Sequence, residues 1–311
     1  MVEPVAFSAL ALDAAIGWPH WLYQRVGHPV GLFARIIATC DARLNRREWP
    51  DHLRKAGGVV TVLILLGCVG GLGMALADLA SRFTGRHSWI IVALLAWPAL
   101  AQRSLDQHFT AVLDSLRAGR IDNARHAVGM IVGRDTASLD EAGVARAAIE
   151  SLAESFCDGV IAPLFWLIVG GLPGVWAMKA VNTADSLIGH KEAPYRDFGW
   201  AAARLDDAMN FVPARIAAVL ICLAGGGGWR ICRTHARRHA SPNAGWPEAA
   251  MAGVLGVRLA GPVSYEGVIA PKPWIGEGSD ADMEKMQQAR RVFRRACLFG
   301  WVIAGGMAWL A

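Results

Sequence analysis

Charged residues are scarce in this chain. Asp, Glu, Lys and Arg make up 18% of its 311 residues, whereas 54% are hydrophobic. A nucleic-acid-binding protein needs a basic surface that neutralises phosphates. Here the net charge of +5 comes mainly from short basic segments between apolar runs, which is typical of cytoplasmic loops. We therefore expect no nucleic-acid partner and a membrane protein, with a large soluble enzyme of buried helices as the alternative.

Several functional signatures are missing as well. The six Cys form no C-x-x-C pair, so we interpret them as reduced structural thiols. The G-x-x-x-x-G-K-[ST], G-x-S-x-G and G-x-G-x-x-G patterns do not occur. We expect no cleavable signal peptide, because Glu3 and Asp13 interrupt the N-terminal apolar region. Internal repeats and heptads are also lacking.

Long uncharged runs are present instead. Residues 56–77 contain no charge, and this length is enough to cross a hydrocarbon core of about 30 Å. Residues 159–178 form a second such run. Shorter or weaker apolar segments lie at 4–16, 88–102, 216–229 and 296–311. We predict an all-α, polytopic integral membrane protein with about four to five transmembrane or re-entrant helices, multi-pass in the cell inner membrane.

The runs divide one membrane-embedded domain, 1–311, into segments. Polar helical segments lie between the apolar ones, and the only strand-like piece is VGMIV, 128–132. In chain order we expect an N-terminal helix and basic segment 1–55, a membrane hairpin 56–102, a polar catalytic segment 103–158, an apolar run 159–178, a polar catalytic segment 179–210, an apolar run 211–229, a basic loop region 230–295 and a C-terminal apolar helix 296–311.

The run 159–178 allows two topologies. GGLPG, at 170–174, would break a straight helix. The segment is either a kinked span or a re-entrant helical hairpin that returns the chain to the side it left. Irregular backbone at membrane depth is tolerated only where it lines a cavity or is buried in protein. The hairpin would place the polar segments on both sides of the run on one face of the membrane.

Three acids precede this run. Glu150, Glu154 and Asp158 are spaced i, i+4, i+8, so on a helix they lie along one side. Ser138 and Glu141 have the spacing of a capping box, which predicts that the helix starts near Ser138.

Two further polar strings follow the run. KAVNTADSLIGHK places Lys179, Asn182 and Ser186 on one helix side, with Asp185 beside them, and RLDDAMNFVPAR places Asp206 and Asn210 at i, i+4. One charged residue at a helix centre costs about 2.5–3.5 kcal/mol on insertion scales. Together, the acids must therefore sit at the membrane interface or around a polar cavity that holds a cation.

We interpret the three strings as a Mg²⁺ and phosphate site. Oxygen ligands from Asp, Glu and Asn suit Mg²⁺, and Arg134 and Lys179 would neutralise phosphate charge. The simpler alternative is that acids and bases at i, i+4 pair along solvated helix faces. His28 is a weaker catalytic candidate, and a metal role for His235 and His239 is disfavoured by the arginines around them.

Taken together, the strings resemble a known family. The quoted residues are HPVGLFAR (28–35), IVGRDT (131–136), RAAIESLAES (146–155), DGVIAPLFW (158–166), KAVNTADSLIG (179–189), RLDDAMNFVPAR (204–215) and SPNAGWPEAAMAGVLGVRLAG (241–261). In this order they are similar to the CobD/CbiB family of cobalamin biosynthesis, over most of the chain. The family usually has Asn at Ser155, Tyr at Met178 and Met-Val-Gly-Tyr at 187–190, and an acid commonly stands at Trp18, so this chain departs from the family pattern at these positions.

The resemblance implies an enzyme, an amide (C–N) ligase of the adenosylcobinamide-phosphate synthase type. Such a protein joins aminopropanol, or its O-phosphate, to a propionate carboxyl of adenosylcobyric acid, with ATP and Mg²⁺ as expected cofactors. Besides these substrates, the implied partners are the lipid bilayer and either a second copy of the chain or other late enzymes of the pathway. The alternatives are a membrane transporter or sensor without ligase activity, and an intramembrane prenyltransferase, because DDAMN resembles a Mg²⁺-diphosphate motif.

Within that resemblance each candidate residue has an expected role. The catalytic set is Glu150, Glu154, Asp158, Lys179, Asn182 and Asp185. The nucleotide-binding set is Arg134, Asp135, Thr136, Lys179, Arg204, Arg215 and Asn243. The metal-binding set is Asp158, Asp206, Asp207 and Asn210.

Overall fold

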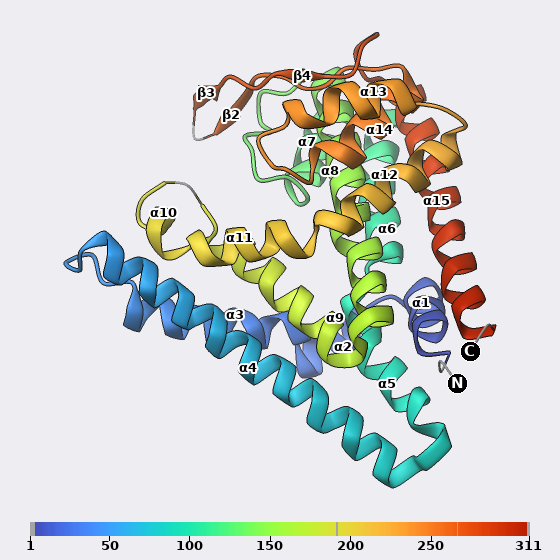
Figure 1. Cartoon of the computed structure of the whole chain (residues 1–311). Coiled ribbons are helices and arrows are strands. Elements are labelled where there is room, and N and C mark those ends of the chain that lie inside the picture. Colours follow the sequence, from blue (N-terminus) through green and yellow to red (C-terminus); the bar gives the residue numbers. More distant parts are fainter. Residues whose placement is uncertain (1–3, 191, 266, 310–311) are drawn as a thin grey trace. The chain divides into compact units, whose positions relative to one another are not determined.

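The computed structural model describes residues 4–190, 192–265 and 267–309. They are mostly helical, as the sequence predicts (Figure 1). The helices are α1 (Val5–Ala15), α2 (His20–Val26), α3 (Pro29–Leu44), α4 (Asp51–Thr84), η1 (Gly85–His87), α5 (Ser88–Ala96), η2 (Trp97–Ala99), α6 (Gln102–Arg117), α7 (Ile121–Gly129), α8 (Glu141–Phe156), η3 (Cys157–Ile161), α9 (Ala162–Ile188), α10 (Tyr195–Phe198), α11 (Trp200–Met209), α12 (Phe211–Gly225), α13 (Trp229–His235), η4 (Ala236–Arg238), α14 (Gly245–Leu255) and α15 (Met283–Trp309). The strands are β1 (Leu259–Ala260), β2 (Val263–Tyr265), β3 (Val268–Ala270) and β4 (Trp274–Ile275).

Contacts group the chain into two compact units that alternate along the sequence. The described residues of unit 1 lie within Met1–Ala101, Ala162–Asn210 and Ile303–Ala311. Those of unit 2 lie within Gln102–Ile161 and Phe211–Val302. Where the sequence predicts one domain, each unit has its own core, and the chain passes between the two several times.

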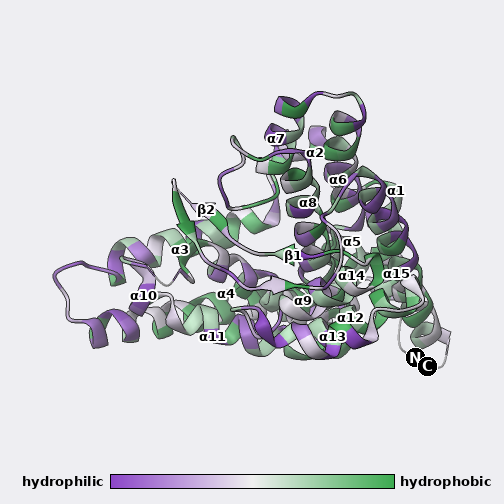
Figure 2. Ribbon diagram, turned by 90° about the horizontal axis from the view of Figure 1, so that it is seen from above, coloured by the Kyte–Doolittle hydropathy of each residue, from purple (hydrophilic) through white to green (hydrophobic). Residues whose placement is uncertain are grey.

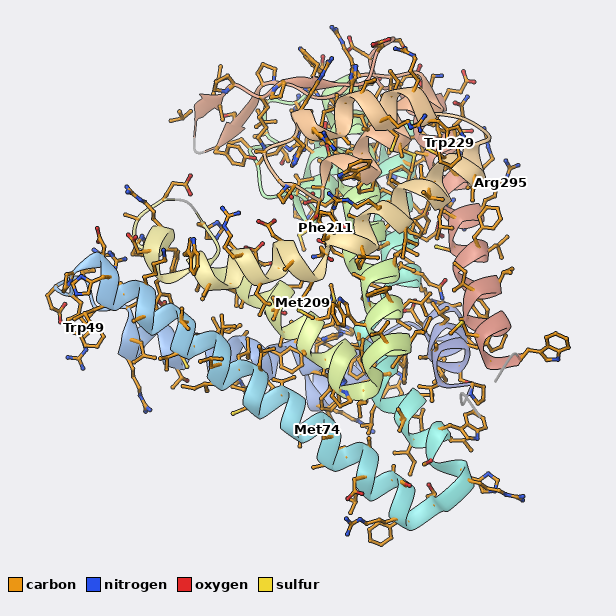
Figure 3. The ribbon with its side chains drawn as sticks, viewed as in Figure 1. Trp49, Met74, Met209, Phe211, Trp229 and Arg295 are labelled. Carbon is orange, nitrogen blue, oxygen red and sulfur yellow. The ribbon has the colours of Figure 1, made fainter. Side chains whose placement is uncertain are left out.

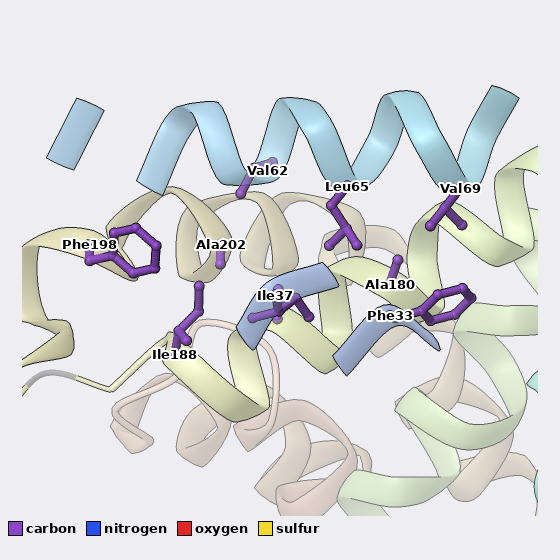
Figure 4. Packing of buried hydrophobic residues seen from close by; sticks show 10 residues of the cluster. Phe33, Ile37, Val62, Leu65, Val69, Ala180, Ile188, Phe198 and Ala202 are labelled. Atoms are coloured by element: carbon purple, nitrogen blue, oxygen red, sulfur yellow. The ribbon is translucent and has the colours of Figure 1, made fainter. Parts of the chain in front are cut away.

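Helix α4 is the centre of unit 1. It packs against α3, α5, α9, α10 and α11. Figure 4 shows Val62, Leu65 and Val69 of α4 among buried side chains of the other helices. Burying one such side chain contributes about 1.5–3 kcal/mol, so this cluster is a main source of stability for the unit. Its remaining buried members are Phe33, Ile37, Ala180, Ala184, Ile188, Phe198 and Ala202.

The two faces of α4 differ. Its buried face contains Gly58 and Gly73, each of which lies directly against another backbone: Gly58 against the Phe198 carbonyl, and Gly73 against Pro173. Its other face is apolar and exposed. Figure 2 colours the ribbon by hydropathy, with hydrophobic residues in green. Met74, which is labelled in Figure 3, is 61% exposed. Extended apolar exposure of this kind marks a surface that contacts lipid or another protein.

The chain reverses direction inside α9. Gly171 has φ +57° and ψ −151°, outside the helical region, and Pro173 follows it. A Cβ atom on Gly174 would lie only 2.6 Å from the carbonyl oxygen of Trp166. Eight residues of a continuous helix rise about 12 Å, so the two arms of α9 form a helical hairpin (Figure 1). Of the two topologies that GGLPG allows, the structure has the hairpin, whose turn packs against α4.

Helix α8 is the centre of unit 2. It packs against α6, α7, α14, η3 and β1. Its alanines at 145, 147, 148 and 153 are fully buried, which lets neighbouring elements approach closely. At its end the ring of Phe156 meets the ring of Phe293 on α15 edge to face, with centroids 5.7 Å apart. Two small antiparallel sheets, β1 with β4 and β2 with β3, follow α14.

Several local predictions need correction. VGMIV is not a strand, because Val128 and Gly129 end α7 and the next residues form a turn. The cap of α8 is Asp140, whose side chain accepts a hydrogen bond of 2.8 Å from Gly143 N, so the helix begins after Ser138. An aspartate directly before the first helical residue competes better for the free N–H groups than a serine three residues away.

The C-terminal third also differs from the prediction. The expected basic loop 230–295 contains α13, η4, α14, the strands and the first half of α15. The four strands are short and lie between glycines and prolines, so periodicity does not reveal them. They add a minor β component to the predicted all-α fold. The expected C-terminal helix 296–311 is the second half of α15, which already begins at Met283.

Two helical stretches of the described chain are long and apolar enough to cross a membrane. They are Asp51–Arg117 and Glu141–Ile188, and α11 with α12 gives a third if that bent pair is counted as one span. The helical architecture is therefore confirmed, and the two or three helices long and apolar enough to span a membrane are consistent with a membrane protein. The number of four to five transmembrane or re-entrant helices stays a prediction.

The close approach at Gly58 gives a stability test. We expect Gly58→Ala to lower the free energy of unfolding by about 1–3 kcal/mol, because the new methyl group would overlap the Phe198 carbonyl. The control is Gly67→Ala on the same helix, where nothing lies within 4 Å of the added atom. That change should be neutral or stabilise by about 0.5–1 kcal/mol, since Ala is the better helix former. Thermal unfolding in a mild detergent measures both, and equal stability of the two variants would contradict the packing at Gly58.

Candidate functional site

The acidic string is divided between two helical elements of unit 2. Glu150 and Glu154 lie one turn apart on α8, as their spacing predicts. Asp158 lies on η3, a single π-helical turn. Because a π-turn contains an extra residue, it rotates the following positions around the helix axis. Asp158 is therefore displaced from the line of the two glutamates.

A cavity of about 260 Å³ lies beside α8, and we call it the Glu150 pocket. It has both acidic and basic side chains in its wall, and all its residues belong to unit 2. Asp158 is not among the described residues that line it. The lining residues are Ile131, Val132, Gly133, Arg134, Glu150, Ser151, Glu154, His239, Glu248, Ala260, Val263, Tyr265 and Lys272.

Glu150 is held on two sides. Only 5% of its surface is exposed, and it forms an ion pair with Arg134. Its Oε1 accepts a hydrogen bond of 2.7 Å from the backbone N–H of Ala260. Ala260 has φ +58°, a left-handed conformation that residues with a Cβ rarely adopt. Strain of this kind persists only where the surroundings impose it, so Glu150 fixes both the Arg134 loop and the start of β1.

Asp135 connects the same loop to the β2–β3 hairpin. Its Oδ2 accepts hydrogen bonds from Ser264 Oγ (2.6 Å) and Gly267 N (2.8 Å). Its own N–H donates to the Ser264 carbonyl at 3.0 Å. In this structure Asp135 positions the wall of the pocket. Thr136 lies next to it and packs against the end of α7 at Gly129.

Glu248, on α14, is the most deeply buried acid of the pocket. Burial raises its pKa well above the usual value, and the negative charges of Glu154 and Glu150 raise it further. The positive charges of Arg134 and Lys272 act in the opposite direction but are weaker. A carboxyl in this environment is held in its neutral form above the pH at which an exposed glutamate ionises.

Three further polar groups of the pocket come from strand β2 and from two loops, the one before α14 and the one between β3 and β4. Nε2 of His239 lies 3.7 Å from Oε1 of Glu248. Nζ of Lys272 donates a hydrogen bond of 2.7 Å to the hydroxyl of Tyr265. Acidic and basic groups therefore face the same small cavity. Such a cavity suits a compact ligand that carries charges of both signs, or two small ligands of opposite charge.

Arg215 and Asn243, both expected to bind nucleotide, contact each other in unit 2. Arg215 Nη1 donates to Asn243 Oδ1 at 2.6 Å, and Nη2 donates to the Pro242 carbonyl at 3.2 Å. The guanidinium also lies over the ring of Phe211, 3.8 Å from its centroid; Figure 3 labels this residue. The interactions fix the loop that leads into α14. Their observed role is to position the helix that carries Glu248.

Unit 1 contains a second polar group, the Asp206 cluster, which consists of Lys179, Asn182, Asp206 and Asn210. Asp206 Oδ1 accepts from Asn182 Nδ2 at 3.3 Å, and Oδ2 accepts from Asn210 Nδ2 at 3.0 Å. Lys179 lies close enough for its charge to act on Asp206. The structure thus brings together residues of the second and third polar strings, from α9 and α11.

Lys179 also faces His28. Burial lowers the pKa of His28, and the nearby positive charge of Lys179 lowers it further. Its Nδ1 accepts a hydrogen bond of 3.3 Å from Val30 N, at the start of α3. His28 is therefore a neutral helix cap at physiological pH, and it belongs to the surroundings of the Asp206 cluster.

The other predicted site residues of unit 1 lie around this cluster. Asp207 forms an ion pair of 3.2 Å with the exposed Arg204 on the same helix. Asp185 lies against Gly189 at the end of α9. Neither residue takes part in the hydrogen bonds that hold Asp206 between the two asparagines.

Four ionisable residues of the Glu150 pocket are missing from the site predicted from the sequence. Glu248 stands in an apolar helix, and Tyr265 and Lys272 stand in a segment expected to be a loop. His239 is absent from the predicted site because the arginines near it in the sequence disfavour a metal ligand. The signal that could have identified Glu248 is its charge within the otherwise apolar PEAAMAGVL, since an unpaired acid is rarely buried.

Metal binding has no preformed centre in the described part of the chain. Across residues 4–190, 192–265 and 267–309, no three His, Cys, Asp or Glu side chains are arranged to hold a metal ion together. His235, for example, is bound by the backbone: its Nδ1 accepts from Gly276 N at 2.9 Å.

The buried Glu248 predicts a pH dependence of stability. The pKa of Glu248 is raised in the folded state above 4.5, the usual pKa of a glutamate. Above pH 4.5 folding is therefore coupled to the binding of a proton, and the free energy of unfolding falls as the pH rises toward the folded pKa. Glu248→Gln cannot ionise and should remove this loss. We expect the variant to gain stability relative to the wild type on going from pH 5 to pH 8, measured by thermal unfolding. The exposed Glu284→Gln on α15 is the control, and parallel pH curves for Glu248→Gln and the wild type would contradict a raised pKa.

Comparisons with known proteins cover nearly the whole chain. The family model described as CobD/Cbib protein matches residues 6–293. A "Cobalamin biosynthesis protein CobD" of Sinorhizobium sp is 47% identical over 312 residues, covering 96% of each chain. Proteins of the same name from Rhodobacter capsulatus and Brucella anthropi are 46% and 43% identical, covering 93% and 96% of this chain and 91% and 95% of their own. No solved structure matches the chain.

The family model and these relatives agree with the strings quoted from the sequence, and the match includes both the Glu150 pocket and the Asp206 cluster. A family model that covers most of a chain, together with sequence identities above 40% over nearly the full length, assigns the chain to one protein family. This chain belongs to the CobD/CbiB family.

Proposed function

We propose that the chain acts in cobalamin biosynthesis as an amide ligase. It would use ATP and Mg²⁺ to join aminopropanol, or aminopropanol O-phosphate, to a propionate carboxyl of adenosylcobyric acid, in the cell inner membrane. The observation that carries the proposal is the Glu150 pocket, a small cavity with buried acids and two cationic side chains, in a chain of this family.

The reaction explains why such a pocket is needed. A carboxylate and an amine do not condense in water, so the carboxylate must first attack a phosphorus atom of ATP. The product is either an acyl phosphate with ADP or an acyl adenylate with pyrophosphate. The amine, an ammonium ion at neutral pH, must first lose a proton. Its nitrogen then attacks the acyl carbon, the phosphate or AMP leaves, and the nitrogen loses a second proton. The protein must hold the reactants in line and accept these protons.

The charges of the pocket match the amine substrate. At neutral pH the amine is an ammonium ion, which Glu154 and Glu150 attract. Glu154, which is exposed and lines the cavity, would accept a proton from the amine, whereas Glu248, whose raised pKa favours the neutral form, would act as a proton donor. Arg134 and Lys272 would bind an anionic group, either the O-phosphate of the amine or the phosphate that leaves.

The Asp206 cluster fits Mg²⁺ in one respect. Oδ1 of Asn210 is buried and has no hydrogen-bond partner among the described residues, and it belongs to the side chain that contacts Asp206. Magnesium binds through one or two carboxylates, waters and substrate phosphates, so it does not require a preformed cage. Asp206, Asp207 and Asn210 would hold the ion, which would neutralise nucleotide phosphates, and Lys179 would clamp a phosphate.

Corrinoid-dependent ATP turnover is the direct test. Purified protein in detergent should consume ATP only when adenosylcobyric acid and the amine are both present, with formation of the amide detected by mass spectrometry. A transporter or sensor would show no product, and a prenyltransferase would consume a prenyl diphosphate instead. Absence of the amide with either amine would overturn the proposal.

Glu154 offers the cleanest test of the pocket. Glu150 is less suitable, because its replacement would leave Arg134 buried without its partner, at a cost of about 3–5 kcal/mol. Glu154 is exposed on α8 and lines the cavity. We expect Glu154→Gln to lower the initial rate by about 10²-fold or more, as for loss of a general acid–base group. Glu141→Gln, an exposed acid in the first turn of the same helix, should keep full rate.

The Asp206 cluster is tested by a grid of Mg²⁺ and ATP concentrations. Asp206→Asn removes a charged ligand and should raise the Mg²⁺ concentration needed for half-maximal rate, with partial rescue by more Mg²⁺. Lys179→Ala should instead weaken ATP binding, so that the ATP concentration needed for half-maximal rate rises. The Mg²⁺ concentration needed for half-maximal rate, the Mg²⁺ midpoint, should stay unchanged. Asp78→Ala, which breaks an exposed ion pair of 2.8 Å with Arg82 on α4, is the matched control. Unchanged midpoints in both variants would show that the cluster has no part in nucleotide binding.

A further inference from the structure

A basic groove lies between α6 and α15 in unit 2. Its cavity is about 180 Å³ and is lined by Leu113, Arg117, Gln287, Arg290, Arg291 and Arg294. The residues of α15 among these are spaced three or four apart, which places them on one side of the helix. The groove is outside the Glu150 pocket, with which it shares no residue.

Asp106 of α6 holds two of the arginines in place. Arg290 donates to its two carboxylate oxygens at 2.8 and 2.9 Å, and Arg294 donates to the same oxygens at 3.0 and 2.7 Å. One negative charge is thus shared by two guanidinium groups. Each guanidinium has five N–H donors, of which Asp106 takes two. The pair keeps a net positive charge and donors for a further anion.

The other two arginines add to this charge. Arg117 lies 3.2 Å from Asp114 on the exposed side of α6. Arg291 has no hydrogen-bond or ion-pair partner among the described residues. Around the groove, four guanidinium groups therefore face two carboxylates. Self-repulsion makes such an arrangement costly unless water or an anion balances it.

Helix α15 becomes apolar directly after the groove. Residues 296–309 contain no charged side chain. Leu298 and Val302 are 63% and 70% exposed, although they are large and hydrophobic. At 1.5 Å per residue, Leu298 is only about 6 Å along the axis from Arg294. At the boundary between phosphate headgroups and acyl chains, basic side chains contact the headgroups and apolar side chains contact the acyl chains. A basic cluster one helical turn from an exposed apolar surface has this arrangement.

We propose that the α6–α15 groove binds the phosphodiester headgroup of an anionic phospholipid, with its acyl chains against the exposed apolar side of α15. Arg291 and Arg117 supply the charge that is not already used by Asp106, and Arg290 and Arg294 supply fixed donors. The apolar surface beside the groove selects a lipid over a free phosphate, because only a lipid covers Leu298 and Val302. This binding is independent of the ligase proposal.

Lipid titration of the full-length protein in an uncharged detergent tests this site. Native mass spectrometry gives the dissociation constants for phosphatidylglycerol and phosphatidylcholine. We expect the wild type to prefer phosphatidylglycerol, and Arg117→Gln/Arg291→Gln to raise its dissociation constant by at least about fivefold, the effect of about one basic residue near an anionic surface. Binding of phosphatidylcholine should not change. Arg291→Gln alone, at a side chain without a partner, should give a smaller shift in the same direction.

The control variant is Arg233→Gln/Arg237→Gln, which removes two exposed arginines of the same unit that lie outside the groove. It should keep the wild-type preference, and millimolar inorganic phosphate should not displace phosphatidylglycerol. The proposal is overturned by equal binding of the two lipids, by an unchanged affinity in the groove variants, by an equal loss in the control, or by full displacement with inorganic phosphate.

Discussion

The buried carboxylate of Glu150 is the interaction on which the candidate site depends. It joins α8, the loop of Arg134 and the first strand through Ala260. In a poorly solvated position a charge is tolerated only when each partner is in place, and loss of one partner is strongly destabilising. The left-handed backbone at Ala260 is maintained by the same contact. The walls of the pocket are therefore positioned by one charged side chain, whose charge is balanced by its partners. For this reason the function and the stability of the pocket are linked.

Three glutamates around this pocket differ in chemistry because their surroundings differ. Glu150 is buried but has a cation beside it, Glu154 is exposed, and Glu248 is buried near two other acids. Desolvation and like charges raise a carboxyl pKa, whereas an adjacent cation opposes the rise. One residue type thus supplies a structural anion, a solvent-facing acid and a proton-binding group. A carboxyl whose pKa is raised by its surroundings, as that of Glu248 is, is typical of sites that transfer protons.

Unit 1 depends on close backbone contacts. Gly58 and Gly73 let α4 pack directly against the segments around Phe198 and Pro173. After the hairpin at Gly171, the second arm of α9 ends at Ile188, and α11 packs back against it, so that Asn182 meets Asp206. The polar cluster therefore depends on the packing of α11 on α9.

Local patterns in the sequence determined which residues form helices and which of them share a helix face. The i, i+4 spacing placed Glu150 with Glu154 and Asp206 with Asn210 correctly, because the helical repeat is a property of the backbone alone. The motif strings were also sufficient to identify the family. Tertiary structure decided which helices meet: it added Glu248, His239 and Lys272 to the pocket, assigned Asp135 and Arg215 to positioning roles, and chose the hairpin over the kinked span. Contacts between distant segments depend on burial and charge compensation in three dimensions, which no local spacing specifies.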